Sequence, residues 1–114
     1  MDSTFSKALQ RVIKKRLRRG VHSDLTIVVE DNSEFQVHKI LLAASSPYFE
    51  TLFKYYPKEP KLYLSLVKRE SMEAIIGIIY GEQPMIPEDQ VFQLLIDADY
   101  LDCSKIVEHY RGSS

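Results

Sequence analysis

The side chains best suited to chemistry are three histidines and one cysteine, and their spacing is the first test for a catalytic or metal-binding protein. They are His22, His38, His109 and Cys103. No histidine lies three or four positions from another histidine or from the cysteine, the spacing that brings metal ligands together on one helix face. Cys103 and His109 are six positions apart, so on a helix they point to different faces and form no thiol–imidazole pair. We therefore expect no metal site, and we interpret Cys103 as a small buried thiol.

Carboxylates and glycines do not favour catalysis either. Asp97 and Asp99 are two positions apart, so on a helix their side chains diverge and do not act as an acid–base pair. The four glycines stand at positions 20, 77, 81 and 112 and form no phosphate-binding loop. We predict that the chain is not an enzyme, takes no cofactor or small-molecule substrate, and works by binding other proteins.

Length and composition restrict the class of protein further. The 114 residues, of which 45% are hydrophobic and 27% charged, suit a single domain over residues 1–114 with a core of its own. A single cysteine excludes an internal disulfide and favours a reducing compartment, the cytoplasm or the nucleus. No apolar run approaches the ~20 residues of a membrane span, so we expect no membrane partner. The amino end is too polar for a signal peptide.

Charge is distributed unevenly along the chain. Residues 1–19 carry seven basic side chains and one acidic one, whereas the remainder carries eight basic and fifteen acidic ones. The net charge of −1 over the whole chain argues against a dedicated nucleic-acid binder. The basic segment itself has three interpretations: a membrane-surface or calmodulin-type helix, a nuclear import or nucleic-acid patch, or an amphipathic helix whose charges are solvated. We favour the third, since solvated charged faces are common.

Hydrophobic periodicity predicts the first half of the fold. A helix is expected over residues 3–20, ending at Gly20. Its apolar side chains form one stripe, which consists of Phe5, Leu9, Val12, Ile13 and Leu17. Alternating apolar residues predict a β-hairpin from strands at 25–29 and 34–37.

Capping residues and further periodicity predict the second half. A helix at 38–44 is followed by one that Ser46 caps, with Pro47 as its first residue. Residues 54–60 are expected to form a loop that bears two tyrosines, and residues 62–64 a short strand. Three further helices follow, at 69–80, from Pro87, and after Asp102 as N-cap. This order describes an α+β domain in which helices cover a small sheet.

Several motifs in this order resemble the BTB/POZ domain family. Residues 23–29 read Ser-Asp-Leu-Thr-Ile-Val-Val, and residues 35–49 read Phe-Gln-Val-His-Lys-Ile-Leu-Leu-Ala-Ala-Ser-Ser-Pro-Tyr-Phe. The stretch 75–81 ends in Ile-Ile-Tyr-Gly, and 94–101 reads Leu-Leu-Ile-Asp-Ala-Asp-Tyr-Leu. The resemblance covers residues 4–110 and implies the BTB/POZ fold, with its core at 20–110 and an additional dimerisation helix at 4–19.

The resemblance implies a symmetric homodimer, or a heterodimer with a related BTB protein, in which the first helix packs on the partner subunit. This places the apolar stripe of residues 3–20 in the dimer interface, where one self-complementary patch suffices. It further implies a charged pair near the interface between Asp24 and Lys39. His38, which precedes Lys39, is equally consistent with a hydrogen-bonded core histidine.

Many members of the family recruit cullin-3 and serve as substrate adaptors of ubiquitin ligases. The resemblance places part of that contact just after the Ser-Pro-Tyr-Phe helix, where an apolar-x-Glu tripeptide is common. The aligned residues here are Pro57, Lys58 and Glu59, so proline stands where the family usually has a large apolar residue. Tyr55 and Tyr56 precede them and are of a type favoured at interfaces.

Three functions follow from this resemblance, the last of which is a purely architectural self-association domain. The first is a dimerising adaptor that docks on cullin-3, in the cytoplasm or the nucleus. The alternative is the dimerisation domain of a transcriptional regulator, which would hold corepressor segments. No substrate-binding domain follows the last predicted helix, so we expect either a module of a longer protein or a protein that acts through dimerisation alone.

Overall fold

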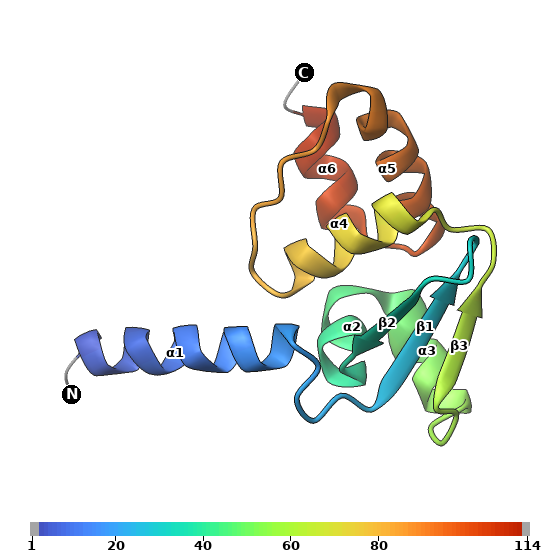
Figure 1. The fold of residues 1–114 in the computed structure, drawn as a ribbon. Coiled ribbons are helices and arrows are strands. Elements are labelled where there is room, and N and C mark those ends of the chain that lie inside the picture. Colours follow the sequence, from blue (N-terminus) through green and yellow to red (C-terminus); the bar gives the residue numbers. More distant parts are fainter. Residues whose placement is uncertain (1–2, 113–114) are drawn as a thin grey trace.

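The computed structural model describes residues 3–112, in which six helices and three strands form an α+β domain (Figure 1). In chain order they are α1 (Ser3–Arg18), β1 (Leu25–Val29), β2 (Glu34–Val37), α2 (Lys39–Ser45), α3 (Pro47–Tyr55), β3 (Lys61–Leu64), α4 (Arg69–Ile79), α5 (Glu88–Tyr100) and α6 (Ser104–Gly112). The predicted fold class and the predicted order of elements are therefore confirmed.

The three strands form one small sheet in the order β2-β1-β3. β1 and β2 form the predicted antiparallel hairpin, in which Leu25 faces Val37, while β3 runs parallel to β1 and pairs Leu62 with Ile27. As the central strand, β1 is buried at four of its five positions. The helices α2 and α3 lie behind the sheet, and α4, α5 and α6 form a second helical layer beside it (Figure 1).

Three helices end in the same hydrogen-bonded motif. The second residue after the end of each of α1, α4 and α5 adopts a left-handed backbone conformation. These residues are Gly20 (φ 87°), Gly81 (φ 89°) and Asp102 (φ 58°). In each case its amide donates to a carbonyl three residues earlier, and the following amide donates to one five residues earlier, which is the Schellman arrangement. Gly20 was predicted, whereas the prediction that Asp102 caps the start of α6 is wrong. Asp102 closes α5 instead, because a short polar side chain tolerates the left-handed region.

The start of α3 follows the predicted capping pattern. The Ser46 hydroxyl accepts a hydrogen bond from the Phe49 amide at 3.3 Å and donates to the Leu101 carbonyl at 2.6 Å. Pro47 is the first helical residue, as predicted. The end of α3 differs from the prediction, because the helix continues to Tyr55 and the loop begins only at Tyr56. At α5 the prediction is wrong by one position, since Pro87 is the N-cap and not the first helical residue.

Helix α1 extends away from the rest of the molecule (Figure 1). The radius of gyration is 14.7 Å. A compact chain of this length would have about 13 Å, and the projecting helix accounts for the difference. The last turn of α1 meets the body, where Leu17 packs against the core and Arg18 pairs with Glu82 at 2.9 Å.

Candidate interaction surfaces

The apolar stripe predicted on the first helix divides into two parts. Leu17 packs against the core of its own chain. The other four side chains are between 46% and 65% exposed on the projecting part of α1, and they are Phe5, Leu9, Val12 and Ile13. Exposed apolar side chains in a row mark a surface that another molecule covers. The structure thus leaves four of the five predicted residues available for a partner.

A buried hydrogen-bond network fixes the point at which α1 joins the body. His38 is 6% exposed, and its Nε2 lies 2.7 Å from the Val21 carbonyl oxygen. Because a carbonyl only accepts, Nε2 carries the proton. Nδ1 then accepts from the Tyr80 hydroxyl at 2.7 Å, and the Tyr80 oxygen accepts from the His38 amide at 2.9 Å. Both ring nitrogens are therefore paired, and His38 is the hydrogen-bonded core histidine that the sequence allowed.

This network connects segments that are distant in the sequence. Val21 follows α1, His38 precedes α2, and Tyr80 ends α4. Burial raises the pKa of the Tyr80 hydroxyl, and the hydrogen bond from the His38 backbone partly opposes that rise. The phenol therefore stays protonated and continues to donate to the imidazole. The network therefore ties the connection between α1 and β1 to the start of α2 and the end of α4.

Asp24 and Lys39 are adjacent, but the contact differs from the charged pair that the resemblance implied. The Asp24 carboxylate oxygen Oδ1 accepts a hydrogen bond from the Lys39 backbone amide at 2.8 Å, at the start of α2. Among the described residues no ion pair joins the two side chains. The reason is local: the N-cap of α2, His38, offers no side-chain cap, and a carboxylate is favoured at a helix start. The Lys39 ammonium donates instead to the Pro57 carbonyl at 2.7 Å.

The two predicted tyrosines lie at the end of α3, beside a groove with a volume of about 550 Å³. Tyr55 is 73% and Tyr56 59% exposed. Two more tyrosines that the sequence analysis did not select line the same groove, Tyr48 from α3 and Tyr100 from α5. We call this the tyrosine groove; its lining is Pro47, Tyr48, Thr51, Leu52, Tyr55, Tyr56, Tyr100 and Asp102.

A signal for one of the missed residues was present in the sequence. Tyr48 precedes Tyr55 by seven positions, which places both on one face of a helix. Tyr100 is 52 positions further along the chain than Tyr48, so only the packing of α5 beside α3 brings it to the groove. Burial raises the pKa of the Tyr48 hydroxyl, with a smaller contribution from Tyr100. The lining of the groove is therefore largely aromatic, with Asp102 as its carboxylate.

The aligned tripeptide after α3 lies beside a second, smaller hollow. Its volume is about 100 Å³, and Tyr56 and Glu59 line it together with Leu62 and the apolar ends of α3 and β1. Pro57, Lys58 and Glu59 are exposed, and of these three only Glu59 lines either hollow. The bond between the Lys39 ammonium and the Pro57 carbonyl holds this loop against the start of α2. Tyr56 and Glu59 therefore form one continuous surface with the tyrosine groove.

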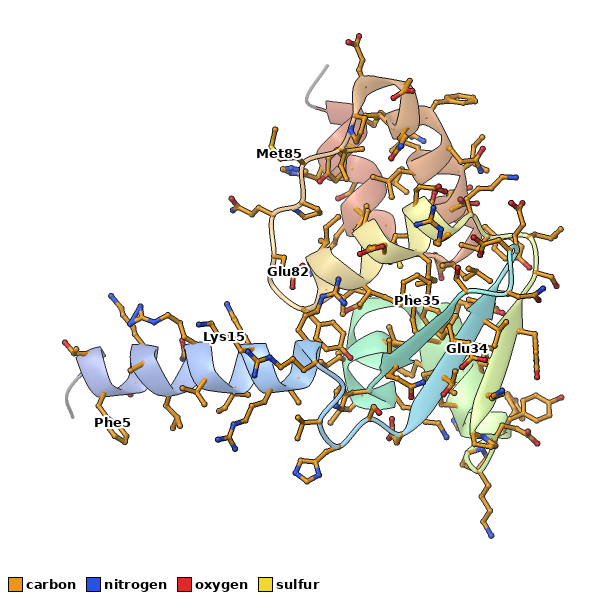
Figure 2. The ribbon with its side chains drawn as sticks, in the orientation of Figure 1. Phe5, Lys15, Glu34, Phe35, Glu82 and Met85 are labelled. Carbon is orange, nitrogen blue, oxygen red and sulfur yellow. The ribbon has the colours of Figure 1, made fainter. Side chains whose placement is uncertain are left out.

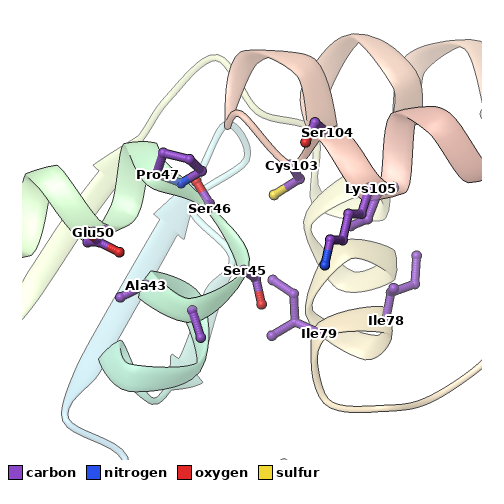
Figure 3. Close-up of a pocket in the computed structure, with 12 residues that line it drawn as sticks. Ala43, Ser45, Ser46, Pro47, Glu50, Ile78, Ile79, Cys103, Ser104 and Lys105 are labelled. Atoms are coloured by element: carbon purple, nitrogen blue, oxygen red, sulfur yellow. The ribbon is translucent and has the colours of Figure 1, made fainter.

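A further hollow lies between α2, α4 and the start of α6, with a volume of about 460 Å³ (Figure 3). Its lining combines small and aliphatic side chains and the Cys103 thiol with two charged side chains, Glu50 and Lys105. Cys103 is 2% exposed, and burial, assisted by the Asp102 charge, raises its pKa to about 11. A thiol with such a pKa is protonated at neutral pH and is a poor nucleophile. This agrees with a buried structural cysteine.

The described part of the chain contains neither a cluster of metal ligands nor a helix suited to a membrane. Between residues 3 and 112, no group of three or more histidine, cysteine or acidic side chains is arranged to hold a metal ion. None of the helices described there has the length and apolar character that crossing a bilayer would require.

A small sheet with helical layers and exposed apolar and aromatic surfaces defines a protein-interaction domain. Comparison with known families gives the same class. The sequence model of the BTB/POZ domain family matches residues 13–113, and the chain belongs to this family. BTB/POZ is a family of protein-interaction domains and not a catalytic one.

Individual relatives support the assignment. The chain is 32% identical over 90 residues to the longitudinals lacking protein, isoforms A/B/D/L, of Drosophila melanogaster, which covers 78% of this chain and 11% of that protein. It is 29% identical over 100 residues to the human transcriptional regulator Kaiso, covering 88% of this chain and 14% of Kaiso. The chain thus spans only a small part of the length of these relatives.

Solved structures show the same fold. The BTB domain of human gigaxonin superposes with a TM-score of 0.79 at 26% identity, covering 100% of this chain and 94% of that one. The BTB domain of zebrafish PATZ1 superposes with a TM-score of 0.81 at 20% identity, covering 99% and 93%. The fold is therefore that of BTB domains over its whole length, α1 included.

Proposed function

We propose that this domain forms a homodimer through α1 and acts as a substrate adaptor that docks on cullin-3. The observation that carries the docking proposal is the tyrosine groove, where four tyrosines from α3, the residue after it and α5 meet beside the tripeptide 57–59. Tyrosine-rich exposed surfaces are typical of protein interfaces, because each ring buries a large area and ends in a hydrogen-bonding group.

The exposed part of the apolar stripe supports the dimer. Two copies of α1 related by a two-fold axis need one patch that is complementary to itself. Phe5, Leu9, Val12 and Ile13 form such a patch on a helix that extends beyond its own body. Asp24 and Lys39 stay predicted members of this interface, and a related BTB protein is the alternative partner.

The cullin-3 contact would use Tyr55, Tyr56 and Glu59 as its principal side chains, with Pro57 and Lys58 at its edge. Pro57 lacks the large apolar side chain that the family usually has at this position. The aromatic area of the tyrosine groove compensates for that loss, since Tyr56 lies in both hollows. Glu59 offers a carboxylate at the rim.

Isothermal titration calorimetry with the amino-terminal region of cullin-3 tests the docking proposal. We expect binding at tens of micromolar or tighter, which corresponds to about 6 kcal/mol or more. Glu59→Ala, and Tyr55→Ala combined with Tyr56→Ala, should each weaken it at least fivefold. The matched control removes two exposed rings elsewhere, Tyr63→Ala with Phe92→Ala, and should bind like the wild type. Absence of binding, or equal losses in both double variants, would refute the adaptor role.

A second candidate function is the dimerisation domain of a transcriptional regulator that binds corepressor segments. It is favoured by the relatives, because Kaiso is named a transcriptional regulator. Failure of cullin-3 binding together with a stable dimer would favour this function over the first. A regulator would act in the nucleus, whereas an adaptor would act in the cytoplasm or the nucleus.

A further inference from the structure

Helix α1 has a second face that dimerisation through the apolar stripe leaves exposed. Five basic side chains lie on this face, at positions 7, 11, 14, 15 and 18. At 3.6 residues per turn they fall within a sector of about 100°, and the four exposed apolar residues occupy another sector centred about 160° away. In Figure 2, Lys15 and Phe5 lie on opposite sides of α1. We define the basic face as Lys7, Arg11, Lys14, Lys15 and Arg18.

Most of this positive charge is not neutralised within the fold. The helix contains no acidic residue. Within the described residues, the one ion pair of α1 joins Arg18 to Glu82 at 2.9 Å. Lys7, Arg11 and Lys15 are exposed on the part of the helix that projects from the body. A row of cations on a projecting helix creates a strong local field that attracts anions.

The inner end of the basic face forms one wall of a groove. The groove has a volume of about 440 Å³ and runs between α1 and the end of α4. Five cations line it from α1 and the residue after it, and Tyr80, Gly81 and Glu82 line it from the other side. The Lys14 side chain lies against Gly81, so the absence of a side chain at Gly81 leaves room for it. The only anion in the lining, Glu82, is already paired.

We propose that the basic face of α1 binds the phosphate backbone of duplex DNA. Between residues 4 and 18, every residue in its sector is a cation except Thr4. The face therefore offers charge and no apolar anchor. Protein interfaces need buried aromatic or apolar anchors and contain few lysines at their centre, whereas nucleic-acid affinity comes chiefly from contacts between cations and phosphates.

Other anionic partners fit this surface less well. Binding of single strands relies on aromatic side chains that stack on bases, and the basic face has none. A helix on a membrane surface inserts its apolar face while cations reach the headgroups, but here the two faces are opposed and the apolar one is needed for the dimer. A helix that contacts the phosphates along both edges of a major groove needs the width of B-DNA, because the major groove of double-stranded RNA is too narrow to admit a helix. At about 1.5 Å per residue, the 16-residue helix spans about 24 Å and reaches several phosphates.

The overall charge of the protein does not contradict this proposal. The value of −1 averages a basic segment with an acidic remainder, and the fold separates the two by projecting α1 from the body. At physiological salt, the Debye length of about 8 Å screens the acidic body from the outer turns of the helix. The local charge on α1 therefore governs binding there. The proposal is independent of cullin-3 docking, which uses a different surface.

Fluorescence anisotropy of the full chain with a fluorescein-labelled 20-base-pair duplex tests it. Binding should weaken about 10²–10³-fold between 50 and 200 mM NaCl, as expected for about five phosphate contacts. The variant Lys7→Gln, Arg11→Gln, Lys15→Gln should bind at least tenfold more weakly at 50 mM and reduce the slope of log K against log salt by about 3. These side chains are exposed, and light scattering should give an unchanged mass.

Matched controls separate this site from general charge effects. Lys54→Gln, Lys58→Gln, Lys105→Gln removes the same charge from exposed positions on the body and should bind DNA like the wild type. Lys7→Arg with Lys15→Arg keeps the charge and should also bind normally. Three outcomes would overturn the proposal: no binding to the duplex at 50 mM, equal losses in the two triple variants, or tighter binding to a single strand, to polyglutamate or to phosphatidylserine vesicles than to the duplex.

Discussion

Two amphipathic helices of this protein have similar sequence patterns and opposite environments. On α4, Met72, Ile75 and Ile76 are 0–1% exposed, because α5 and α2 pack against this helix. On α1, Leu9 and Ile13 are 48% and 46% exposed, because the helix projects beyond the body. An apolar stripe thus indicates that a helix has a partner surface, but not whether that surface belongs to the same chain. The following predictions test this contrast.

The same substitution on both helices should have different consequences. Ile75→Ala removes buried methyl groups and should lower the free energy of unfolding by about 2–5 kcal/mol at any protein concentration. Ile13→Ala should lower it by less, and only at concentrations where the dimer forms, because it acts through association. Urea unfolding at two protein concentrations measures both effects. Equal, concentration-independent losses would mean that α1 packs on its own chain.

The free energy of unfolding should be next most sensitive to the hydrogen-bond network around His38. This network joins the end of α4 to the α1–β1 connection. Tyr80→Phe removes the hydroxyl that pairs with both the amide and Nδ1 of buried His38. We expect a loss of about 1–3 kcal/mol, since two polar atoms lose their partner. Tyr63→Phe, at an exposed tyrosine, is the control and should change stability by less than about 0.5 kcal/mol. Thermal unfolding of the two variants provides the comparison.

A pH titration reports burial in the helical layer that covers α4. The pKa of Cys103 is raised to about 11 from 9.0, so its stabilising effect is complete below pH 9 and is lost as the pH rises towards 11. The stability difference between the wild type and Cys103→Ala should therefore be about 1 kcal/mol smaller at pH 10 than at pH 8. Urea midpoints at the two pH values measure it. A constant difference would mean that the thiol is accessible to solvent.

Charges placed on the exposed apolar stripe of α1 should change the free energy of unfolding least and the oligomeric state most. Leu9→Asp with Ile13→Asp places charges on the exposed stripe and should give monomers by light scattering. The free energy of unfolding of the monomer should change by less than about 0.5 kcal/mol, because neither side chain is buried. Leu9→Gln with Gln10→Leu moves one apolar residue out of the stripe and should weaken the dimer less. An unchanged mass for the aspartate variant would exclude α1 from the interface.

Most of the secondary structure was predictable from the sequence, whereas parts of the candidate sites were not. The Ser46–Pro47 start of α3 and the Gly20 end of α1 depend on hydrogen bonds between near neighbours, so the residue types alone indicated them. Asp102 was assigned the wrong role because its side chain suits both an N-cap and a left-handed position. The Asp24–Lys39 contact was expected between charges, but the free amides at the start of α2 attract the carboxylate.

The sequence by itself determined the order of helices and strands, the α+β class and the presence of an apolar stripe on the first helix. Those properties follow from periodicity and capping, which act over a few residues. Only the tertiary structure decided that Tyr100 joins Tyr48 in one groove and that His38 holds Tyr80 to Val21. It likewise decided that the cations of α1 project from an acidic body. These arrangements depend on packing between residues far apart in the chain, which local patterns do not specify.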